Sequence, residues 1–320
     1  LCSHMCVIAS GKRGICGVRE NQDGVLKTLV YGRLIAAGDD PIEKKPIFHL
    51  MPGSRSFSIA TVGCNFKCRF CQNADIAQMP ADRDGMVTGD PSTPEQVVAA
   101  ARKRNCASIA YTYTEPTVFF EFACDTAKLA RRQGIKNIFV TNGFMSADAL
   151  QRVSPWLDAA NVDLKAFSDD FYKQQCGARL EPVKETLRRM KDLNIWVEVT
   201  TLIIPGLNDA PEPLSGLAAF ISQELGVETP WHVSRFHPTY RLTDRGSTPV
   251  ETLLKARDIG TAAGLRYVYT GNIPGQGGED TICPGCGETA IARRGFEITH
   301  NQVREGRCSG CGTVIDGVSM

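Results

Sequence analysis

The residues best suited to chemistry in this sequence are three cysteines that lie close together, Cys64, Cys68 and Cys71. Iron-sulfur cubes are normally held by four thiolates, so a loop that supplies three leaves one iron open to a small-molecule ligand. The C-x3-C-x2-C spacing, with the aromatic Phe70 before the last cysteine, therefore indicates a 4Fe-4S cluster with an open iron. The alternatives are a zinc knuckle with a distant fourth ligand and three structural thiols.

An open iron suits a ligand that carries an amine and a carboxylate side by side, as the methionine end of S-adenosylmethionine does. One electron then breaks a carbon-sulfur bond of S-adenosylmethionine and yields a 5′-deoxyadenosyl radical, chemistry that the cofactor performs while the protein holds it in place. The contrasting interpretation is a non-enzymatic metal or electron-transfer protein, whose cluster would be closed to S-adenosylmethionine.

Four cysteines near the C-terminus form two CxxC pairs, each followed by glycine: Cys283 with Cys286, and Cys308 with Cys311. This spacing predicts a metal ribbon. Zinc is favoured and a single rubredoxin-like iron is the alternative, because both metals accept four sulfur ligands in tetrahedral geometry. A pair of disulfides is a further alternative. Such a ribbon either stabilises the C-terminus or docks a protein partner.

The N-terminus offers a third group of metal ligands, Cys2, Cys6 and Cys16 together with His4. Three thiols and an imidazole suit a second metal ion or an auxiliary cluster. The sequence therefore predicts a second metal or cluster site here.

The elements that position these cysteines are predicted from the hydrophobic pattern. Between about residues 55 and 272, short apolar segments alternate with amphipathic ones, which is typical of βα units around a parallel sheet. Six or seven such units predict a full or partial TIM-like (β/α) barrel, with the chemistry on the loops that follow the strands. The expected strands are Phe57 to Thr61, Ser108 to Tyr113, Asn137 to Thr141, Ala160 to Leu164, Trp196 to Leu202, His232 to Phe236 and Tyr267 to Thr270.

Three parts are expected along the chain: a cysteine-containing extension over residues 1–52, the α/β core over 53–274 and the metal ribbon over 275–320. The chain has 36 lysines and arginines and 35 aspartates and glutamates, so its net charge is close to zero. A near-zero net charge gives no long-range electrostatic attraction to a nucleic acid or an anionic membrane. No long apolar run or signal peptide is visible, and the odd number of 13 cysteines argues against a pure disulfide framework. A reducing cytoplasm is the expected location.

With these motifs in place, the chain resembles a radical SAM enzyme of the branch that includes the pyruvate formate-lyase activating enzymes. The closest resemblance is to the radical SAM enzyme of the AmmeMemoRadiSam system. The segments that carry it run through the chain: residues 14–21, 40–46, 61–65, 71–73, 113–116 and 176–182.

The resemblance implies roles for polar residues after the strands. In the superfamily a Gly-Gly-Glu segment often binds the methionine amine; here Tyr113, Thr114, Glu115 and Pro116 stand in its place without the glycines, and Glu115 remains the expected acceptor. The resemblance also places Asn142 near the ribose and carboxylate. It places Asp163 and Lys165 at the end of the fourth strand, and Thr201 along the adenine side. For each of these the alternative is an ordinary polar residue at a strand end.

Two further residues are candidates for catalysis. His237 follows the sixth strand and is expected to donate a hydrogen bond to S-adenosylmethionine or to substrate, with a structural histidine as the alternative. Cys176 lies in a loop after the fourth strand, where a thiol could give or take a hydrogen atom; a buried structural cysteine is the alternative.

The resemblance also suggests partners. It implies hydrogen abstraction from a partner protein, with AMMECR-type and MEMO-type proteins as partners and flavodoxin or ferredoxin as reductant. Abstraction from a small molecule is the competing interpretation. The resembled family has another cysteine just upstream of the position of Leu1, which would complete the N-terminal site.

Overall fold

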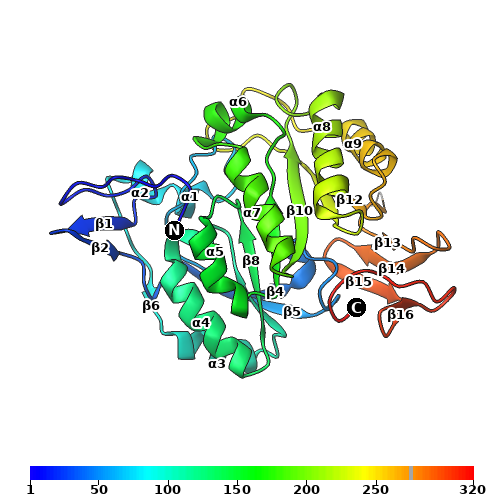
Figure 1. Cartoon of the computed structure of the whole chain (residues 1–320), viewed down its shortest axis with the longest axis horizontal. Coiled ribbons are helices and arrows are strands. Elements are labelled where there is room, and N and C mark those ends of the chain that lie inside the picture. The colour runs from blue at the N-terminus through cyan, green and yellow to red at the C-terminus, as the bar shows by residue number, and fades with distance from the viewer. Residues whose placement is uncertain (274–276) are drawn as a thin grey trace.

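In this computed structural model, which describes residues 1–273 and 277–320, the central element is a sheet of eight strands (Figure 1). Seven of them are parallel, and β4 pairs antiparallel with β5 at one edge. In spatial order the strands are β12 (Val268–Gly271), β11 (Trp231–Arg235), β10 (Trp196–Ile203), β9 (Ala159–Asp163), β8 (Lys136–Thr141), β7 (Ser108–Tyr111), β5 (Arg55–Ala60) and β4 (Ala36–Pro41).

The seven strands expected from the sequence are all present, with ends shifted by a few residues. The edge strands β12 and β4 are not paired with each other in the described part of the chain, so the barrel is partial. Strand β4 was missed because its sequence, Ala-Ala-Gly-Asp-Asp-Pro, has no apolar alternation. It lies within residues 1–52, so the core begins earlier than predicted. The predicted boundary between residues 274 and 275 lies outside the described residues.

Helices cover the outer face of this sheet (Figure 1). Helix α3 begins with a capping box between Thr93 and Gln96, and Pro94 occupies its first turn. Helix α4 buries Phe122 and Ala127 along one side. These apolar faces and the sheet form the main core. The longer helices are α3 (Pro94–Lys103), α4 (Phe120–Arg132), α5 (Ala147–Val153), α7 (Glu181–Asp192), α8 (Pro211–Phe220) and α9 (Val250–Ala262).

Short helical turns connect these elements. The α-helical turns are α1 (Ala74–Ala77), α2 (Met79–Asp82) and α6 (Asp169–Phe171). The 3-10 turns are η1 (Ile42–Lys44), η2 (Pro116–Phe119) and η3 (Ser154–Trp156), and the π-helical turns are η4 (Tyr172–Cys176) and η5 (Ile221–Leu225). No helix of the described residues is both long and apolar enough to cross a membrane.

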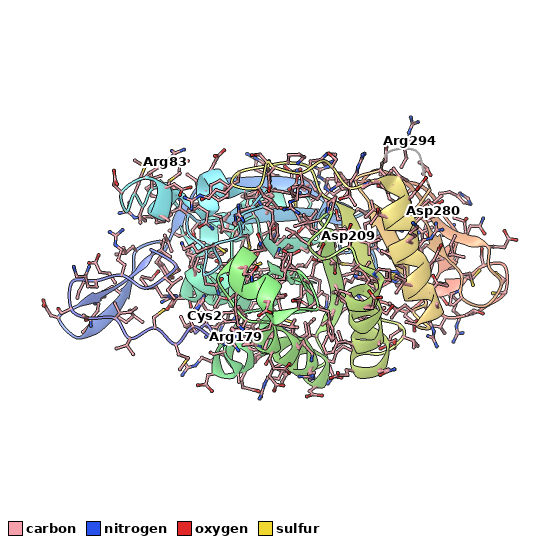
Figure 2. All side chains as sticks on the ribbon, turned by 90° about the horizontal axis from the view of Figure 1, so that it is seen from above. Cys2, Arg83, Arg179, Asp209, Asp280 and Arg294 are labelled. Carbon is pink, nitrogen blue, oxygen red and sulfur yellow. The ribbon has the colours of Figure 1, made fainter. Side chains whose placement is uncertain are left out.

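Two small appendages lie at opposite ends of the barrel, the N-terminal one in blue and the C-terminal one in orange and red (Figure 1), and Figure 2 shows the same arrangement from above. The N-terminal one is a hairpin of β1 (Arg19–Gln22) and β2 (Val25–Thr28), which Arg19 ties to Glu121 of α4 at 2.6 Å. A short pair, β3 (Arg33–Leu34) and β6 (Asp90–Pro91), lies beside it. The C-terminal appendage contains β13 (Thr281–Ile282), β14 (Thr289–Arg294), β15 (Glu297–Asn301), β16 (Val303–Arg304) and β17 (Arg307–Cys308).

The C-terminal appendage is held to the core by buried polar contacts. The ring of His49 lies between two partners: its Nδ1 donates to the backbone oxygen of Asp316 at 2.6 Å, and its Nε2 accepts from the hydroxyl of Tyr269, also at 2.6 Å. Arg293 of β14 donates to the backbone oxygen of Phe48 at 3.1 Å. The appendage is therefore a fixed part of the fold.

Candidate active site

The carboxyl ends of the parallel strands open into a cavity of about 410 Å³. Parallel strands direct the loops after their carboxyl ends to one edge of the sheet, so side chains far apart in the sequence meet there. Nine predicted site residues line this cavity: Cys64, Cys68, Phe70, Cys71, Thr114, Glu115, Asn142, Asp163 and Lys165.

The cysteine loop is held rigidly after β5. Gly63 adopts a φ of +97°, and a Cβ there would come within 2.6 Å of Val18. The backbone amides of Lys67 and Arg69 donate to residues of the π-helical turn η4, at 2.8 and 2.9 Å. Phe70 is buried against the ring of Phe171. These contacts fix the loop so that its three thiols face the same cavity.

The spacing of these thiols separates the two metal interpretations. Among the described residues, the ligand atoms of one group alone all lie within 4.8 Å of one another, and that group is the C-terminal four cysteines. Cys64, Cys68 and Cys71 share a cavity but stand farther apart than this. Such separation suits a cluster, which spreads its cysteines over several irons, better than it suits a single zinc ion.

The cavity also has unsatisfied polar groups that fit a bound ligand. Two buried atoms of its lining residues, the Oδ1 of Asn161 and the Oγ1 of Thr200, have no hydrogen-bond partner in the described part of the chain. Buried polar atoms are normally paired, so these two are free to bind a polar molecule in the cavity. The residues present therefore fit a cluster together with a second, polar ligand.

Burial raises the pKa of Cys64, and it raises the pKa of Cys71 to about 11. The pKa of Cys68 is also raised, first by its hydrogen bond with the thiol of Cys176 and then by burial. Desolvation disfavours the thiolate in each case. The three sulfurs would therefore be neutral without a cation, and a bound metal would supply the charge that ionises them.

Glu115 is a buried carboxylate that joins the loops after β7 and β8. It accepts hydrogen bonds from the backbone amide of Asn142 at 2.8 Å and from the hydroxyls of Thr117 and Thr141 at 2.6 and 2.8 Å. Burial raises the pKa of Glu115, and these hydrogen bonds offset part of the rise. Within the described residues no lysine or arginine forms an ion pair with it. A cationic ligand in the cavity would supply that charge.

Asp163 and Lys165 lie at the end of β9 as a cavity-lining pair, with Nζ and Oδ2 2.7 Å apart. Burial opposes the charge on Lys165, but the adjacent carboxylate of Asp163 outweighs it and holds the pKa of Lys165 above its usual value. The backbone oxygen of Lys165 accepts from Asn208 at 2.8 Å, which fixes the turn after the strand. The pair therefore presents a positioned cation and carboxylate.

Thr201 does not line the cavity. Its hydroxyl donates to the backbone oxygen of Leu164 at 2.9 Å and accepts from the indole of Trp231 at 3.0 Å. Successive residues of a strand point to opposite faces, so the neighbouring Thr200 faces the cavity instead. Thr201, the residue predicted to lie along the adenine side, therefore does not face the cavity, and its neighbour Thr200 does.

The two proposed catalytic residues also lie outside the set of lining residues. His237 is exposed, and its Nδ1 lies 2.9 Å from the hydroxyl of Ser247. Cys176 is fully buried at the end of η4, where its thiol contacts Cys68. The structure therefore places Cys176 behind a predicted cluster ligand and His237 on the surface.

Sequence analysis missed a cationic group in the cavity wall. Lys45 and Tyr113 both line the cavity, and Lys45 forms an ion pair with Asp40 at 2.6 Å. The Tyr113 hydroxyl also donates to Asp40, at 2.5 Å. Burial lowers the pKa of Lys45, and Asp40 offsets part of that effect. The signal was available, since Asp40 and Lys45 belong to one of the segments that carry the family resemblance, but no role was assigned to it.

The C-terminal cysteines lie close enough together to bind one metal ion. The sulfurs of Cys283 and Cys311 are 3.5 Å apart, and those of Cys286 and Cys308 are 3.9 Å apart. Four sulfurs bound tetrahedrally to zinc at about 2.3 Å are about 3.8 Å from one another. Gly287 and Gly312 follow the two pairs with positive φ, as such knuckles require. The residues fit one tetrahedral ion.

Comparisons with known proteins agree with this architecture. The family model described as "Radical SAM superfamily" matches residues 58–215. An uncharacterized protein of Methanocaldococcus jannaschii is 47% identical over 318 residues, which cover 99% of this chain and 94% of that protein. The pyruvate formate-lyase-activating enzyme of Clostridium pasteurianum is 25% identical over 183 residues, covering 55% of this chain and 73% of that enzyme.

A solved structure is similar as well. The crystal structure of a radical SAM methyltransferase from Sphaerobacter thermophilus superposes with a TM-score of 0.54 at 16% identity, covering 69% of this chain and 67% of that one. At this identity the likeness shows the fold.

Proposed function

The chain belongs to the radical SAM superfamily, and we propose that it is an enzyme that cleaves S-adenosylmethionine reductively and abstracts a hydrogen atom from a partner protein. The observation that carries this proposal is the arrangement of Cys64, Cys68 and Cys71. They come from one loop and face a cavity that also holds a buried carboxylate and free polar atoms.

When bound at these thiols, a reduced 4Fe-4S cluster supplies the electron that splits S-adenosylmethionine into methionine and a 5′-deoxyadenosyl radical. The protein's own residues bind and orient the ligand. Glu115 accepts the methionine ammonium, because a buried carboxylate without an ion pair favours a cation. Asn142 and the pair of Asp163 and Lys165 bind the remaining polar groups, and Thr200 takes the place assigned to Thr201.

A partner protein as substrate is supported by the similarity to pyruvate formate-lyase-activating enzymes. We propose AMMECR-type and MEMO-type proteins as partners, with flavodoxin or ferredoxin as reductant, on the resemblance of the whole chain to the AmmeMemoRadiSam enzyme.

A small-molecule substrate is the second candidate, and one observation favours it. A neighbouring cavity of about 580 Å³ shares Thr200, Ser234 and Phe296 with the first. Phe296 belongs to the turn between β14 and β15, so the C-terminal appendage lines both cavities. Polar and ionisable side chains of Glu43, His232 and Arg294 also line the second cavity, which therefore suits a polar metabolite.

The proposal is tested by reconstituting the protein anaerobically with iron and sulfide, adding dithionite and S-adenosylmethionine, and quantifying 5′-deoxyadenosine and methionine. The matched control is the variant Cys64→Ala/Cys68→Ala/Cys71→Ala. Formation of 5′-deoxyadenosine by the parent alone is the expected result. Its absence from a parent with a full cluster, in the presence of partner proteins and cell metabolites, would contradict the proposal.

The substrate class is tested by deuterium. AMMECR-type or MEMO-type protein is produced in deuterated medium and added to the reaction. If it is the substrate, the 5′-deoxyadenosine acquires one deuterium atom and its mass rises accordingly. If labelled metabolite extract alone transfers deuterium, the small-molecule candidate is correct instead.

A further inference from the structure

We propose that Cys2, Cys6 and Cys16 hold a second 4Fe-4S cluster, in a cavity of their own beside the cysteine loop. The three residues line one cavity of about 230 Å³. No part of the proposed reaction uses them, and the similarity to the activating enzyme covers only 55% of the chain.

The first argument is that the fold brings these thiols to one cavity from separate turns. Cys16 lies in a tight turn, in which the amide of Gly17 donates to the backbone oxygen of Gly14 at 2.9 Å. A Cβ at Gly14 would come within 3.1 Å of Ile8 and 3.8 Å of the sulfur of Cys6. A side chain at Gly14 would press against Ile8, which also lines the cavity, and would touch the Cys6 thiol at ordinary van der Waals distance. Glycine at this position therefore leaves room in the cavity wall.

The second argument is that the terminal segment is docked. Cys2 forms a β-bridge with Met145, in the loop after β8. The amide of Ser3 donates to the backbone oxygen of Phe144 at 3.1 Å, and the amide of Ser146 donates to that of Leu1 at 2.8 Å. Terminal residues are poorly ordered unless something ties them down. Here the β-bridge and the two backbone hydrogen bonds hold Cys2 at the cavity wall.

The third argument is the spacing of the sulfurs, which can be compared with that of the two other cysteine groups in this chain. The four cysteines of the ribbon lie at single-ion spacing, with all sulfurs within 4.8 Å. The thiols of Cys64, Cys68 and Cys71 face one cavity at wider spacing. Cys2, Cys6 and Cys16 follow the second pattern, because they too share a cavity without reaching single-ion spacing among the described residues. The N-terminal thiols are therefore not arranged for a single ion, and the cavity that they share is the observation that supports a cluster.

His4 connects this site to the first one and offers a further donor. Its Nε2 lies 2.7 Å from the backbone oxygen of Asn65. A carbonyl oxygen only accepts, so Nε2 donates to it, and in the neutral ring Nδ1 is then the nitrogen with the lone pair that a metal binds. Asn65 follows Cys64 directly and accepts from the side chain of Asn142 at 2.7 Å. The two cavities thus share a hydrogen-bonded wall.

The test is to count acid-labile sulfide in full-length protein reconstituted anaerobically. A single zinc or iron ion in the ribbon contains no such sulfide, so sulfide reports clusters alone. The variant Cys64→Ala/Cys68→Ala/Cys71→Ala should retain about four sulfides and about four cluster irons per chain, with the Mössbauer spectrum of a 4Fe-4S cluster. Adding Cys2→Ser/Cys6→Ser/Cys16→Ser to it should remove them all.

The matched control adds Cys124→Ser, a half-buried thiol of α4 outside both cavities, and should leave the sulfide count unchanged. Two results would overturn the proposal. One is a Cys64→Ala/Cys68→Ala/Cys71→Ala variant that melts like the parent but binds no sulfide. The other is a zinc ion, beyond the one in the ribbon, that is lost with Cys2, Cys6 and Cys16.

Discussion

Glu115 shows how one residue can serve both the fold and the ligand. Its carboxylate joins the loops after β7 and β8 through Thr141 and Asn142, and it lines the cavity without an ion pair among the described residues. Burying a charge in this way is costly unless hydrogen bonds or a counter-charge compensate. The hydrogen bonds compensate in part, and we expect the ligand ammonium to supply the rest.

We predict that Glu115→Gln weakens S-adenosylmethionine binding by about 10- to 100-fold, as expected for the loss of about 1.5–3 kcal/mol from a charged hydrogen bond. Equilibrium binding to the anaerobic protein would measure it, with iron content confirming that the cluster remains. Glu121→Gln, which removes a carboxylate paired with Arg19 outside the cavity, is the matched control and should bind normally. Equal affinity in the two variants would exclude Glu115 as the amine acceptor.

The ribbon thiols differ from one another in acidity, and this predicts how they behave once the metal is removed. The Thr313 hydroxyl lies 3.2 Å from the sulfur of Cys311 and, by donating to the thiolate, lowers the pKa of Cys311 to about 6. At pH 7 this thiol is mostly ionised, and ionised thiols are the reactive form.

We therefore predict that, after chelation, iodoacetamide at pH 7 labels Cys311 faster than it labels an ordinary exposed thiol such as that of free cysteine. The rate should fall as the pH drops through about 6. Mass spectrometry of quenched samples measures it, and Thr313→Val should slow the labelling of Cys311. A reaction at Cys311 that rises only above pH 8 would show that the hydrogen bond is absent in the metal-free ribbon.

At the scale of the elements, the alternation of β10 decides which side chains face the cavity. Thr200 and Leu202 face the cavity, while Thr201 faces the helical layer and satisfies the buried indole of Trp231. The two threonines are neighbours with opposite surroundings, so they form a natural pair for comparison.

We predict that Thr201→Val destabilises the protein by about 2–4 kcal/mol, because it leaves the Trp231 donor and the Leu164 oxygen unpaired in the core. Thr200→Val should change stability by less than about 1 kcal/mol but weaken S-adenosylmethionine binding by about 2- to 10-fold, since its hydroxyl has no partner within the described residues. Urea unfolding and equilibrium binding measure the two effects. If Thr201→Val is the variant that loses affinity at unchanged stability, the assignment of faces is wrong.

At the scale of the whole molecule, the C-terminal ribbon is fastened to the barrel through buried ionisable groups. The carboxylate of Glu198 on β10 accepts from the backbone amides of Phe48 and His49, at 3.0 and 2.8 Å, and from the ring of His232 at 2.7 Å. Burial lowers the pKa of His49 to about 4, although Glu198 opposes this shift. His49 is thus neutral in the folded protein, as its two hydrogen bonds require.

This predicts a loss of stability in mild acid. Below its ordinary pKa of about 6.5, the unfolded chain takes up a proton at His49 that the folded protein does not bind until about pH 4, so stability falls across this window by up to about 3 kcal/mol. Urea unfolding at a series of pH values between 6.5 and 5 measures the slope. His49→Gln should be less stable than the parent at pH 7 yet show a flatter slope. Parallel slopes for the two proteins would exclude the effect.

The sequence by itself determined what local spacing controls. The C-x3-C-x2-C loop, the two CxxC knuckles and all seven parallel strands follow from residues close together in the chain, because cluster loops, knuckles and buried strands need residue types at fixed short intervals. Nine of the predicted site residues were found around one cavity for a related reason, since each lies at the carboxyl end of a parallel strand or in the loop that follows it.

Only the tertiary structure decided which side chains face that cavity and which distant segments meet. It placed Thr200 and not Thr201 at the cavity, brought Lys45 to the cavity wall beside Tyr113, and added β4 to the sheet. It also docked the segment that contains Cys2 on the loop after β8. These outcomes depend on pairing and burial between segments far apart in the chain, and neither composition nor spacing contains that information.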